Sequence, residues 1–433
     1  MAETTKQPIK KNRYAWVILF VCITTAICGG GLVTNTYGVF LPFIVADMGF
    51  GAAQTSAIMT ISSWTTVFVY FVATKILVKF KVRWITTIAG VLVAATLYGY
   101  SNAVEIWQFY LCAASIGILG AFLSFNVIPL LINNWFIKYK NFAVGLALMF
   151  TGITGAVFNP ILASISTQHG WRRGYEIAAI IALLYPIVAA IFARATPAEK
   201  GLLPLGIEDS EEMKNVNLDS TEIKEFPGIP AKYAVKSFPF YLVIIFVITN
   251  SFGSGFNQHW VNLGVSYGHD AVKAATLASV SLLSVAVLKV IMGMVNDKFG
   301  LLKSTVIASA GGIIACIILM INNGKSFGMI QVACIFMALA ICITTIQPPM
   351  LIRDIFGMRD YSSLYPVAYM GMSLGTGTTY TLHGIFIQYS GSYMGSFIFN
   401  LCSYAVGILV VIIAYKMVPK LKANYWREVG ETL

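Results

Sequence analysis

Charged residues are scarce in this sequence. Asp, Glu, Lys and Arg make up only 11% of the 433 residues, whereas soluble domains carry about 25%. The chain is 58% hydrophobic and its mean hydropathy is +0.77, so it lacks the polar surface that keeps a soluble protein in water. The composition therefore indicates an integral membrane protein embedded in a lipid bilayer.

Several motifs that would define an enzyme or an ATP-driven pump are missing. No GxxxxGK[ST] motif occurs, which excludes a P-loop ATPase. No close His/Cys/Asp cluster and no evident Ser-His-Asp set is present, so we predict no metal, no cofactor and no enzymatic activity. The seven cysteines form no CxxC pair, and we interpret them as small packing residues.

The apolar residues are gathered into twelve stretches, and a membrane-crossing helix needs about 20 such residues. The stretches are centred near residues 28, 64, 92, 119, 154, 183, 251, 283, 312, 338, 376 and 404. The first begins at Trp16 and runs to about Phe40, which is too long for the core of a signal peptide. The pattern predicts an all-α integral membrane protein with twelve transmembrane helices in two pseudo-symmetric six-helix bundles.

A polar stretch rich in Glu, Asp, Lys and Pro separates the first six spans from the last six. It is too short and too polar to form a domain of its own. We therefore predict a cytoplasmic leader (1–15), an N-terminal bundle (16–195), a cytoplasmic linker (196–237), a C-terminal bundle (238–417) and a cytoplasmic tail (418–433).

The basic residues lie mainly on one side of this topology. Of the 29 Lys and Arg, the loops on the outside hold only Arg172, Arg173, Lys273 and Lys325, and Lys289 lies within a span. The others lie on the side of the termini, which the positive-inside rule identifies as the cytoplasm. This asymmetry accounts for the net charge of +11 without a nucleic-acid partner. We expect a monomeric, multi-pass protein of the cell (inner or plasma) membrane with both termini in the cytoplasm.

Residues 293–303, GMVNDKFGLLK, fit the pattern G-x-x-x-D-[RK]-x-G-x-x-[RK] where the eighth span meets the cytoplasm. This stretch resembles the loop signature of the major facilitator superfamily, in its second-half copy. The equivalent place in the first half, residues 73–84, keeps only the basic residues. The resemblance implies conformational gating for Gly293, Asp297 and Lys298, with the glycine allowing close approach of two helices.

The start of the fifth span, WFIKYKNFAVGLALMFTGITG (135–155), carries a second resemblance. It is similar to the aromatic-Phe-x-Lys and Ala-x-Gly-x-Ala motif of monocarboxylate transporters and oxalate/formate antiporters, although Met149 and Phe150 depart from the pattern. The stretches HGWRRGYE (169–176) and TPAEKGLLPLG (196–206) look like the corresponding turns of the same families. Lys138 is the lysine of the aromatic-Phe-x-Lys motif, and we place it among the gating residues.

Lys289 lies inside the eighth span, four residues before Gly293. The branch that the chain resembles usually carries an arginine at this spacing. A charge inside a span is costly and marks a functional site by default, and an ammonium facing a cavity would attract a carboxylate. The alternative is that Lys289 snorkels to the inner surface, although Gly293 and Asp297 place that surface about 9–12 Å away at 1.5 Å per residue.

No Asp or Glu occurs in the middle of any span, and Val285 stands where proton-coupled monocarboxylate transporters commonly have an aspartate. His383 is a further ionisable group, in the eleventh span. The resemblance to the oxalate-type antiporters implies a second cation on this helix. A histidine there can bind an anion, couple a proton near neutral pH, or simply pack. A histidine in place of a fixed cation favours a monoanion over a dianion such as oxalate.

Other polar residues of the spans are candidates to line a cavity, although Asn and Tyr equally join helices by hydrogen bonds. They are Asn35, Tyr37, Asn126, Asn257, His259 and Tyr380.

These features together predict a transporter of a small organic anion, a monocarboxylate, that works by alternating access. Lys289 would bind the anion, and a proton or a counter-anion would be coupled, with exchange or facilitated movement favoured over symport driven by Asp or Glu. One alternative keeps the fold but carries a neutral or cationic compound, with Lys289 structural. The other is a transporter-like membrane sensor.

Overall fold

The computed structural model describes residues 13–137, 139–206, 228–357 and 359–429, which form helices and no β-strand. The prediction of an all-α fold is therefore confirmed. The helices of the first half are α1 Tyr14–Thr25, η1 Ala26–Gly31, α2 Leu32–Thr34, α3 Tyr37–Met48, α4 Ala52–Lys79, α5 Val82–Asn102, α6 Ile106–Gly120, α7 Ser124–Trp135, α8 Lys140–His169, α9 Trp171–Ala182, α10 Leu184–Phe192 and η2 Pro197–Lys200. Those of the second half are α12 Ala231–Ala234, α13 Phe238–Phe256, η4 Asn257–His259, α14 Trp260–Ser266, α15 Ala271–Phe299, α16 Leu301–Asn322, α17 Phe327–Phe356, α18 Tyr361–Ser390 and α19 Met394–Val429.

Among the described residues, nine helical stretches are long and apolar enough to cross a membrane. The predicted count of twelve is therefore confirmed only in part. The helices α4 and α18 are long enough, with 28 and 30 residues, but they are rich in Ser, Thr and Tyr and are not among the nine. The remaining predicted span is divided into α6 and α7, and α6 is shorter than a full span.

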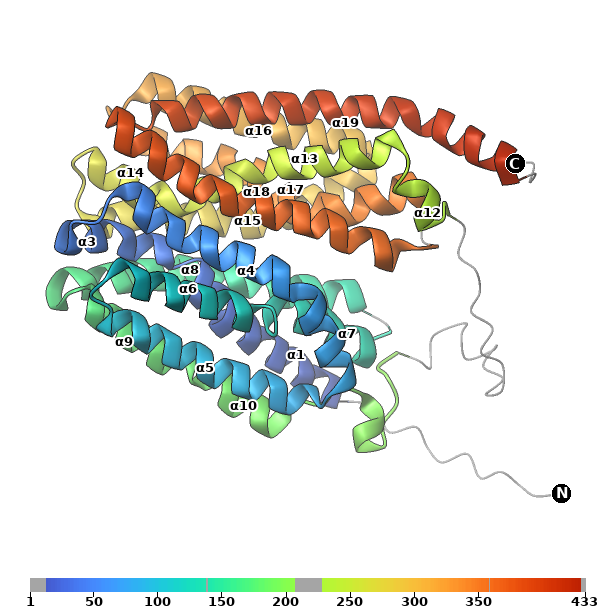
Figure 1. Cartoon of the computed structure of the whole chain (residues 1–433), viewed down its shortest axis with the longest axis horizontal. Helices are drawn as coiled ribbons and strands as arrows, with labels where there is room; N and C mark the ends of the chain where they lie inside the picture. Colours follow the sequence, from blue (N-terminus) through green and yellow to red (C-terminus); the bar gives the residue numbers. More distant parts are fainter. Residues whose placement is uncertain (1–12, 138, 207–227, 358, 430–433) are drawn as a thin grey trace.

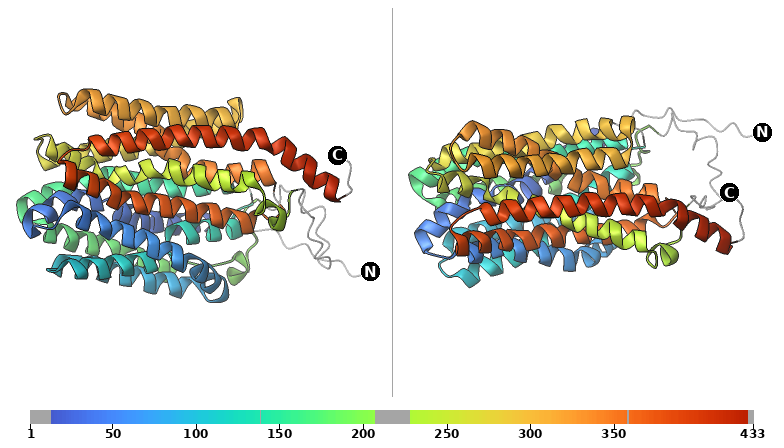
Figure 2. Two further views of the ribbon diagram at one scale, coloured as in Figure 1. Left: turned by 45° about the horizontal axis from the view of Figure 1, so that its top comes forward. Right: turned by 90° about the horizontal axis from the view of Figure 1, so that it is seen from above.

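The helices form two layered bundles, one from each half of the sequence (Figure 1). The helices run along a common direction, which the turned views in Figure 2 show as well. The start of α1 and the end of α19 lie at the same end of the molecule. We call this end the termini side and the opposite end, where α3 and α14 meet, the far side.

Two pairs of long helices join the bundles, in addition to the contact of α3 with α14 and η4: α4 packs on α18, and α8 packs on α15. The α4–α18 pair is held by hydroxyl groups, because the Thr60 Oγ1 donates to the carbonyl of Gly377 and lies 2.8 Å from the Thr381 Oγ1. Small residues let these helices approach closely. The polar character of α4 and α18 thus follows from their position, since their hydroxyls face a protein partner and not lipid.

The first span and the seventh span are both broken near their middle. In the first, the α-helix passes into the π-helix η1 and stops at the bend of Asn35 and Thr36 before α3 begins. In the seventh, three consecutive polar residues form the 3₁₀-helix η4 between α13 and α14. Irregular backbone at membrane depth persists only where protein or a water-filled cavity surrounds it, so the breaks locate an internal site.

The bundles are in closer contact on the far side than along α8 and α15 on the termini side. A Cβ on Gly38 would lie 2.5 Å from the Gln258 carbonyl oxygen, and one on Gly384 would lie 2.6 Å from the Ala52 carbonyl oxygen. In contrast, a Cβ on Gly145 of α8 or Gly293 of α15 would meet nothing within 4 Å. The close helix approach expected at Gly293 is therefore not made in this conformation.

Gly38→Ala tests the close contact on the far side. We expect a lower melting temperature, because overpacking a tight contact costs about 1–3 kcal/mol. The matched variant Gly145→Ala adds the same methyl group where there is room and gains about 1 kcal/mol of helix propensity, so its melting temperature should be equal or higher. Thermal unfolding of the purified proteins measures both, and equal melting temperatures for the two variants would contradict this packing.

Candidate functional site

A cavity of about 190 Å³ lies between the two bundles, next to both broken spans. Residues from both halves of the chain line it. The lining residues that matter most below are Asn35, Asn257, Gln258, Lys289, Thr344, Thr345 and Tyr380. This volume is below the roughly 300–1,000 Å³ of sites for drug-sized ligands, so the cavity fits a small molecule.

Lys289 reaches the cavity from one face of α15. The other lining residues of this helix are Leu282, Val285 and Ala286, and with Lys289 they follow the three- and four-residue spacing of a single helical face. The Lys289 side chain is half-buried, and among the described residues its ammonium forms no ion pair and no hydrogen bond. The ammonium interacts electrostatically with the thiol of Cys342 on α17.

The described lining of the cavity contains one cationic side chain and no acidic one. The rest of its polar surface consists of hydroxyl and amide groups, which can donate hydrogen bonds to an anion. Apolar side chains from Leu148, Met149, Ile341 and Met372 complete the wall. The arrangement therefore suits a small molecule with one negative group and an apolar remainder.

Gln258 joins the two broken spans. Its Nε2 donates to the Thr34 carbonyl oxygen at 2.6 Å, and its Oε1 accepts from the Gly38 N–H at 3.0 Å. Thr34 and Gly38 are four residues apart, so they would bond to each other in a continuous α-helix. The side-chain amide of Gln258 has inserted into that gap, a known cause of helix breaks, and it supplies both partners from the opposite bundle.

The sequence analysis did not select Gln258, although it named both of its neighbours. The available signal was the run of three polar residues, Asn257 to His259, inside an apolar span. In a regular helix these residues would point in three directions. Because η4 changes the helical period, the sequence could not tell which of them faces the cavity.

Four of the predicted site residues line the cavity together: Asn35, Asn257, Lys289 and Tyr380. Two of them are also held by hydrogen bonds within their own bundle. The Asn35 Nδ2 donates to the Thr151 carbonyl oxygen at 2.9 Å, and the Asn257 Oδ1 accepts from the Ser281 hydroxyl at 2.8 Å. Both roles considered for these residues, lining the cavity and joining helices, are thus present.

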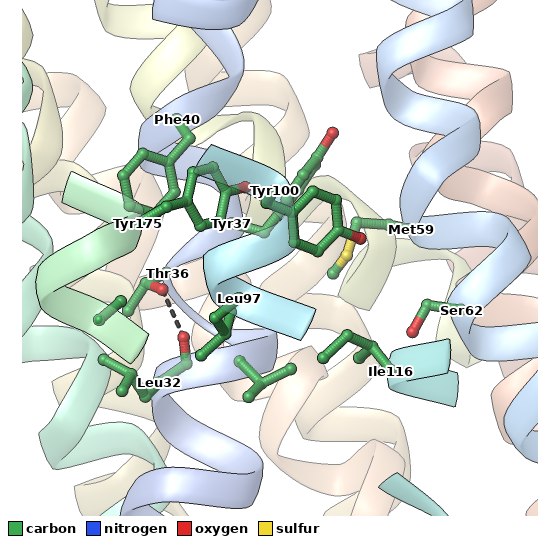
Figure 3. Close-up of a pocket in the computed structure, with 12 residues that line it drawn as sticks. Leu32, Thr36, Tyr37, Phe40, Met59, Ser62, Leu97, Tyr100, Ile116 and Tyr175 are labelled. Atoms are coloured by element: carbon green, nitrogen blue, oxygen red, sulfur yellow. Dashed lines mark hydrogen bonds between the residues drawn. The ribbon is translucent and has the colours of Figure 1, made fainter. Parts of the chain in front are cut away.

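Tyr37 lines a separate, small pocket inside the first bundle (Figure 3) and is not among the lining residues of the central cavity. Its hydroxyl donates to the Thr55 carbonyl oxygen at 2.7 Å. Around it lie stacked rings, with the Phe40 and Tyr175 centroids 4.0 Å apart and those of Tyr100 and Tyr175 5.1 Å apart. The space they enclose is only about 20 Å³, room for little more than a water molecule, so Tyr37 serves packing here.

His383 and His259 lie behind the cavity wall, inside the second bundle. Both side chains are buried, and their ring centroids are 5.6 Å apart. His259 Nε2 lies 3.3 Å from the carbonyl oxygen of Tyr380, whose side chain does line the cavity. The structure therefore brings the two histidines together, next to the cavity and not among its lining residues.

The predicted gating residues of α15 lie on the termini side. Gly293 and the exposed Lys298 belong to the last turns of α15. Lys138 and the side chains of Asn126 and Asp297 are outside the described residues, so their roles stay predictions. Among the described residues, no group of three or more His, Cys, Asp or Glu could hold a metal ion.

Two helical bundles around a central cavity, with broken helices at that cavity, are typical of a membrane transport protein. A family model described as Major Facilitator Superfamily matches residues 19–281 and 240–429, and the chain belongs to this superfamily. The membership that the 293–303 motif suggested is therefore confirmed.

One curated relative is monocarboxylate transporter 13 of Bos taurus, which is 25% identical over 290 residues. That match covers 66% of this chain and 62% of the relative, so it spans less than two thirds of the relative's length. The relative agrees with the branch suggested by residues 135–155.

Solved transporter structures share the fold at low identity. The D-xylose-proton symporter has a TM-score of 0.71 at 15% identity and covers 97% of this chain and 100% of its own. The nucleoside transporter NupG has a TM-score of 0.67 at 13% identity, with 94% and 99% covered. The peptide transporter POT, in complex with sulfate, has a TM-score of 0.70 at 10% identity, with 96% and 99% covered. These proteins are named for different substrates. Membership of the family therefore identifies a transporter, and its substrate has to be inferred from the cavity.

Gln258→Leu tests the bridge between the broken spans. The change leaves the Thr34 carbonyl and the Gly38 N–H without partners, at about 1–3 kcal/mol for each buried group. We expect the far side to open more often. Spin labels at Gln168 and Lys325, which are exposed on the far side of the two bundles, should give longer distances in the variant than in the wild type.

The exposed Cys402 and the half-buried Cys112 are first replaced by serine, so that only the introduced cysteines take the label. Gln168→Cys and Lys325→Cys without the leucine substitution give the reference distance. An identical distance distribution with and without Gln258→Leu would show that the amide bridge does not hold the far side closed.

Proposed function

We propose that this protein is a secondary transporter of a small organic anion, a monocarboxylate, that works by alternating access. The observation that carries the proposal is the position of Lys289, whose ammonium faces the central cavity without an acidic partner among the described residues.

The cost of burying this charge supports a role for Lys289 in binding. A lysine in the middle of a span costs about 2.5–3.5 kcal/mol on insertion scales. An ion pair with a residue of another helix would recover part of that cost, but the other polar side chains in the described lining are hydroxyl and amide groups. A carboxylate substrate is the remaining source of negative charge, and its binding neutralises the site.

The other lining residues favour a monocarboxylate with a short apolar part. Thr344, Thr345 and Tyr380 carry hydroxyls that can donate to a carboxylate. Leu148, Met149 and neighbouring apolar side chains can contact a short hydrocarbon or keto-acid chain. A dianion would leave one negative charge unpaired, because Lys289 is the one cationic side chain in the described lining.

The conformation supports alternating access with the far side closed. The positive-inside rule places the termini side in the cytoplasm, so this state would face inward, in the inner or plasma membrane. The moving bodies are the bundles at 16–195 and 238–417, and the gate on the cytoplasmic side involves Gly293, Asp297, Lys298 and Lys138. Closing that gate requires α8 and α15 to approach where Gly145 and Gly293 now have free space.

Lys289→Ala should abolish or strongly weaken carboxylate exchange. Charge-assisted hydrogen bonds contribute about 1.5–3 kcal/mol, so we expect the apparent KM to rise about 10- to 100-fold. The assay is counterflow in proteoliposomes with labelled formate, acetate, lactate, pyruvate and butyrate. Lys289→Arg keeps a positive charge and should retain part of the activity.

Lys273→Ala is the control, because Lys273 is a lysine of the same helix that is exposed on the far side, outside the cavity. Its KM should equal that of the wild type. The methyl ester of a transported acid should not compete with that acid for transport. Transport of none of the five acids, or equal KM values for Lys289→Ala and Lys273→Ala, would sink the proposal.

A further inference from the structure

A chain of buried hydrogen bonds in the second bundle ends at the wall of the central cavity. It runs from Ser309 on α16 through Asn250 on α13 to Thr344 on α17, and α17 packs on both of the other helices (Figure 1). All three side chains are buried. Of the three, only Thr344 lines the cavity. The chain therefore links two side chains that lie outside the cavity wall with a hydroxyl that belongs to it.

The side-chain amide of Asn250 is held in one orientation. The Ala340 carbonyl oxygen only accepts hydrogen bonds, so the amide atom that lies 3.1 Å from it is the donor Nδ2. The same nitrogen carries a second hydrogen, which it donates to the Thr344 Oγ1 at 3.2 Å. The Oδ1 accepts from the Ser309 hydroxyl at 3.2 Å. Both amide atoms are thus occupied, and Asn250 acts on Thr344 as a donor.

The hydroxyl of Thr344 can serve a bound molecule only through its hydrogen. A hydroxyl has two lone pairs and one hydrogen. At Thr344 the lone pairs accept from the Asn250 Nδ2 and from the Ser254 hydroxyl, each at 3.2 Å. Its oxygen lies 3.4 Å from the Ala340 carbonyl oxygen, whereas a typical O–H···O bond measures about 2.7–2.8 Å. The hydrogen is therefore weakly held and can turn to an acceptor in the cavity.

This hydroxyl faces the same cavity as Lys289. The helices α15 and α17 pack on each other, and Cys342, which interacts electrostatically with Lys289, is two residues before Thr344. The ammonium of a lysine is a compact charge that attracts a carboxylate without fixing its direction. Ser254 also lines the cavity, but it gives its hydrogen to Thr344. Thr344 is therefore the member of this pair that can donate a second hydrogen bond to the anion.

We propose that Asn250, itself held by Ser309, is a positioning residue that keeps the Thr344 hydroxyl as a hydrogen-bond donor to the substrate carboxylate. This role rests on the function proposed above and adds to it two residues that do not touch the substrate. Lys289 supplies the positive charge, and the Thr344 hydroxyl supplies a second, directed contact. The carboxylate is then held from two helices, which fixes its orientation in the cavity.

The same hydrogen bonds also join three helices, which is a common role of Asn and Ser in membrane bundles. The two roles differ in how Asn250 depends on Thr344. An amide that only joins helices affects transport in the same way whether or not residue 344 carries a hydroxyl. A positioning amide acts on the substrate through that hydroxyl, so its effect disappears when the hydroxyl is removed. A double-mutant cycle separates these cases.

The test measures KM and Vmax of the purified full-length protein in proteoliposomes, with the labelled monocarboxylate that shows the fastest wild-type counterflow. Thr344→Val keeps the shape of the side chain and removes the hydroxyl, and its KM should rise about tenfold. Asn250→Leu removes the amide and should raise KM about fivefold, with Vmax within about twofold of wild type. Added to Thr344→Val, the same Asn250→Leu change should alter KM by less than about twofold.

Three further variants complete the cycle. Thr344→Ser keeps the hydroxyl and should stay within about twofold of the wild-type KM. Ser309→Ala releases the Asn250 Oδ1 and should raise KM about threefold, again with no effect when Thr344→Val is present. It makes the same comparison if Asn250→Leu fails to fold. Asn159→Leu is the matched control, since Asn159 is a buried asparagine of α8 that does not line the cavity, and its KM should equal that of the wild type.

Any of three results would overturn the positioning role while carboxylate transport stands. They are a wild-type KM for Thr344→Val, separate effects of Asn250→Leu and Thr344→Val that multiply in the double variant, and equal KM values for Asn250→Leu and Asn159→Leu. Absence of wild-type counterflow with every acid would instead overturn the proposed function, and the positioning role with it. The two failures are therefore distinguished by the wild-type protein alone.

Discussion

A helix that is broken inside a bilayer must find partners for the backbone groups it releases, because the hydrocarbon offers none. In this protein the break in the first span is completed by Gln258, which belongs to the opposite bundle. The same contact defines the closed far side and one wall of the cavity, and it lies next to the histidine pair. The side-chain amide of Gln258 therefore both completes the backbone hydrogen bonds of the broken span and holds the two bundles in their relative position.

The sequence predicted the parts of this molecule that depend on regular helices. Lys289 lies where helical spacing on α15 puts it, one turn from Val285 and on the same face as Leu282. The pattern of apolar stretches likewise predicted the helices and the separation into halves. The apolar pattern is weak in α4 and α18, because these helices carry many hydroxyl side chains. Those side chains are tolerated because the two helices pack on each other and shield them from lipid.

The site was less predictable where the helices are irregular. In η4 the change of period turns Gln258 and Asn257 towards the cavity and His259 behind its wall. Tyr37 follows directly after the bend at Asn35 and Thr36, and that bend directs it into the aromatic cluster of the first bundle. His383 lies three residues after Tyr380 on α18, but it is buried against Phe256 inside the second bundle and does not line the cavity. The spacing of residues in the sequence does not predict such rotations.

The contact between α4 and α18 has a consequence for motion. Its hydroxyls hydrogen-bond to backbone carbonyls and to one another, as Thr60 does with Gly377 and Thr381, and glycines keep the opposing surface smooth. A hydroxyl can pass from one carbonyl to the next by rotating a single bond, so neither helix needs to shed a polar group into lipid while it slides. The α4–α18 pair can therefore slide while one bundle tilts against the other, with little loss of hydrogen-bond enthalpy.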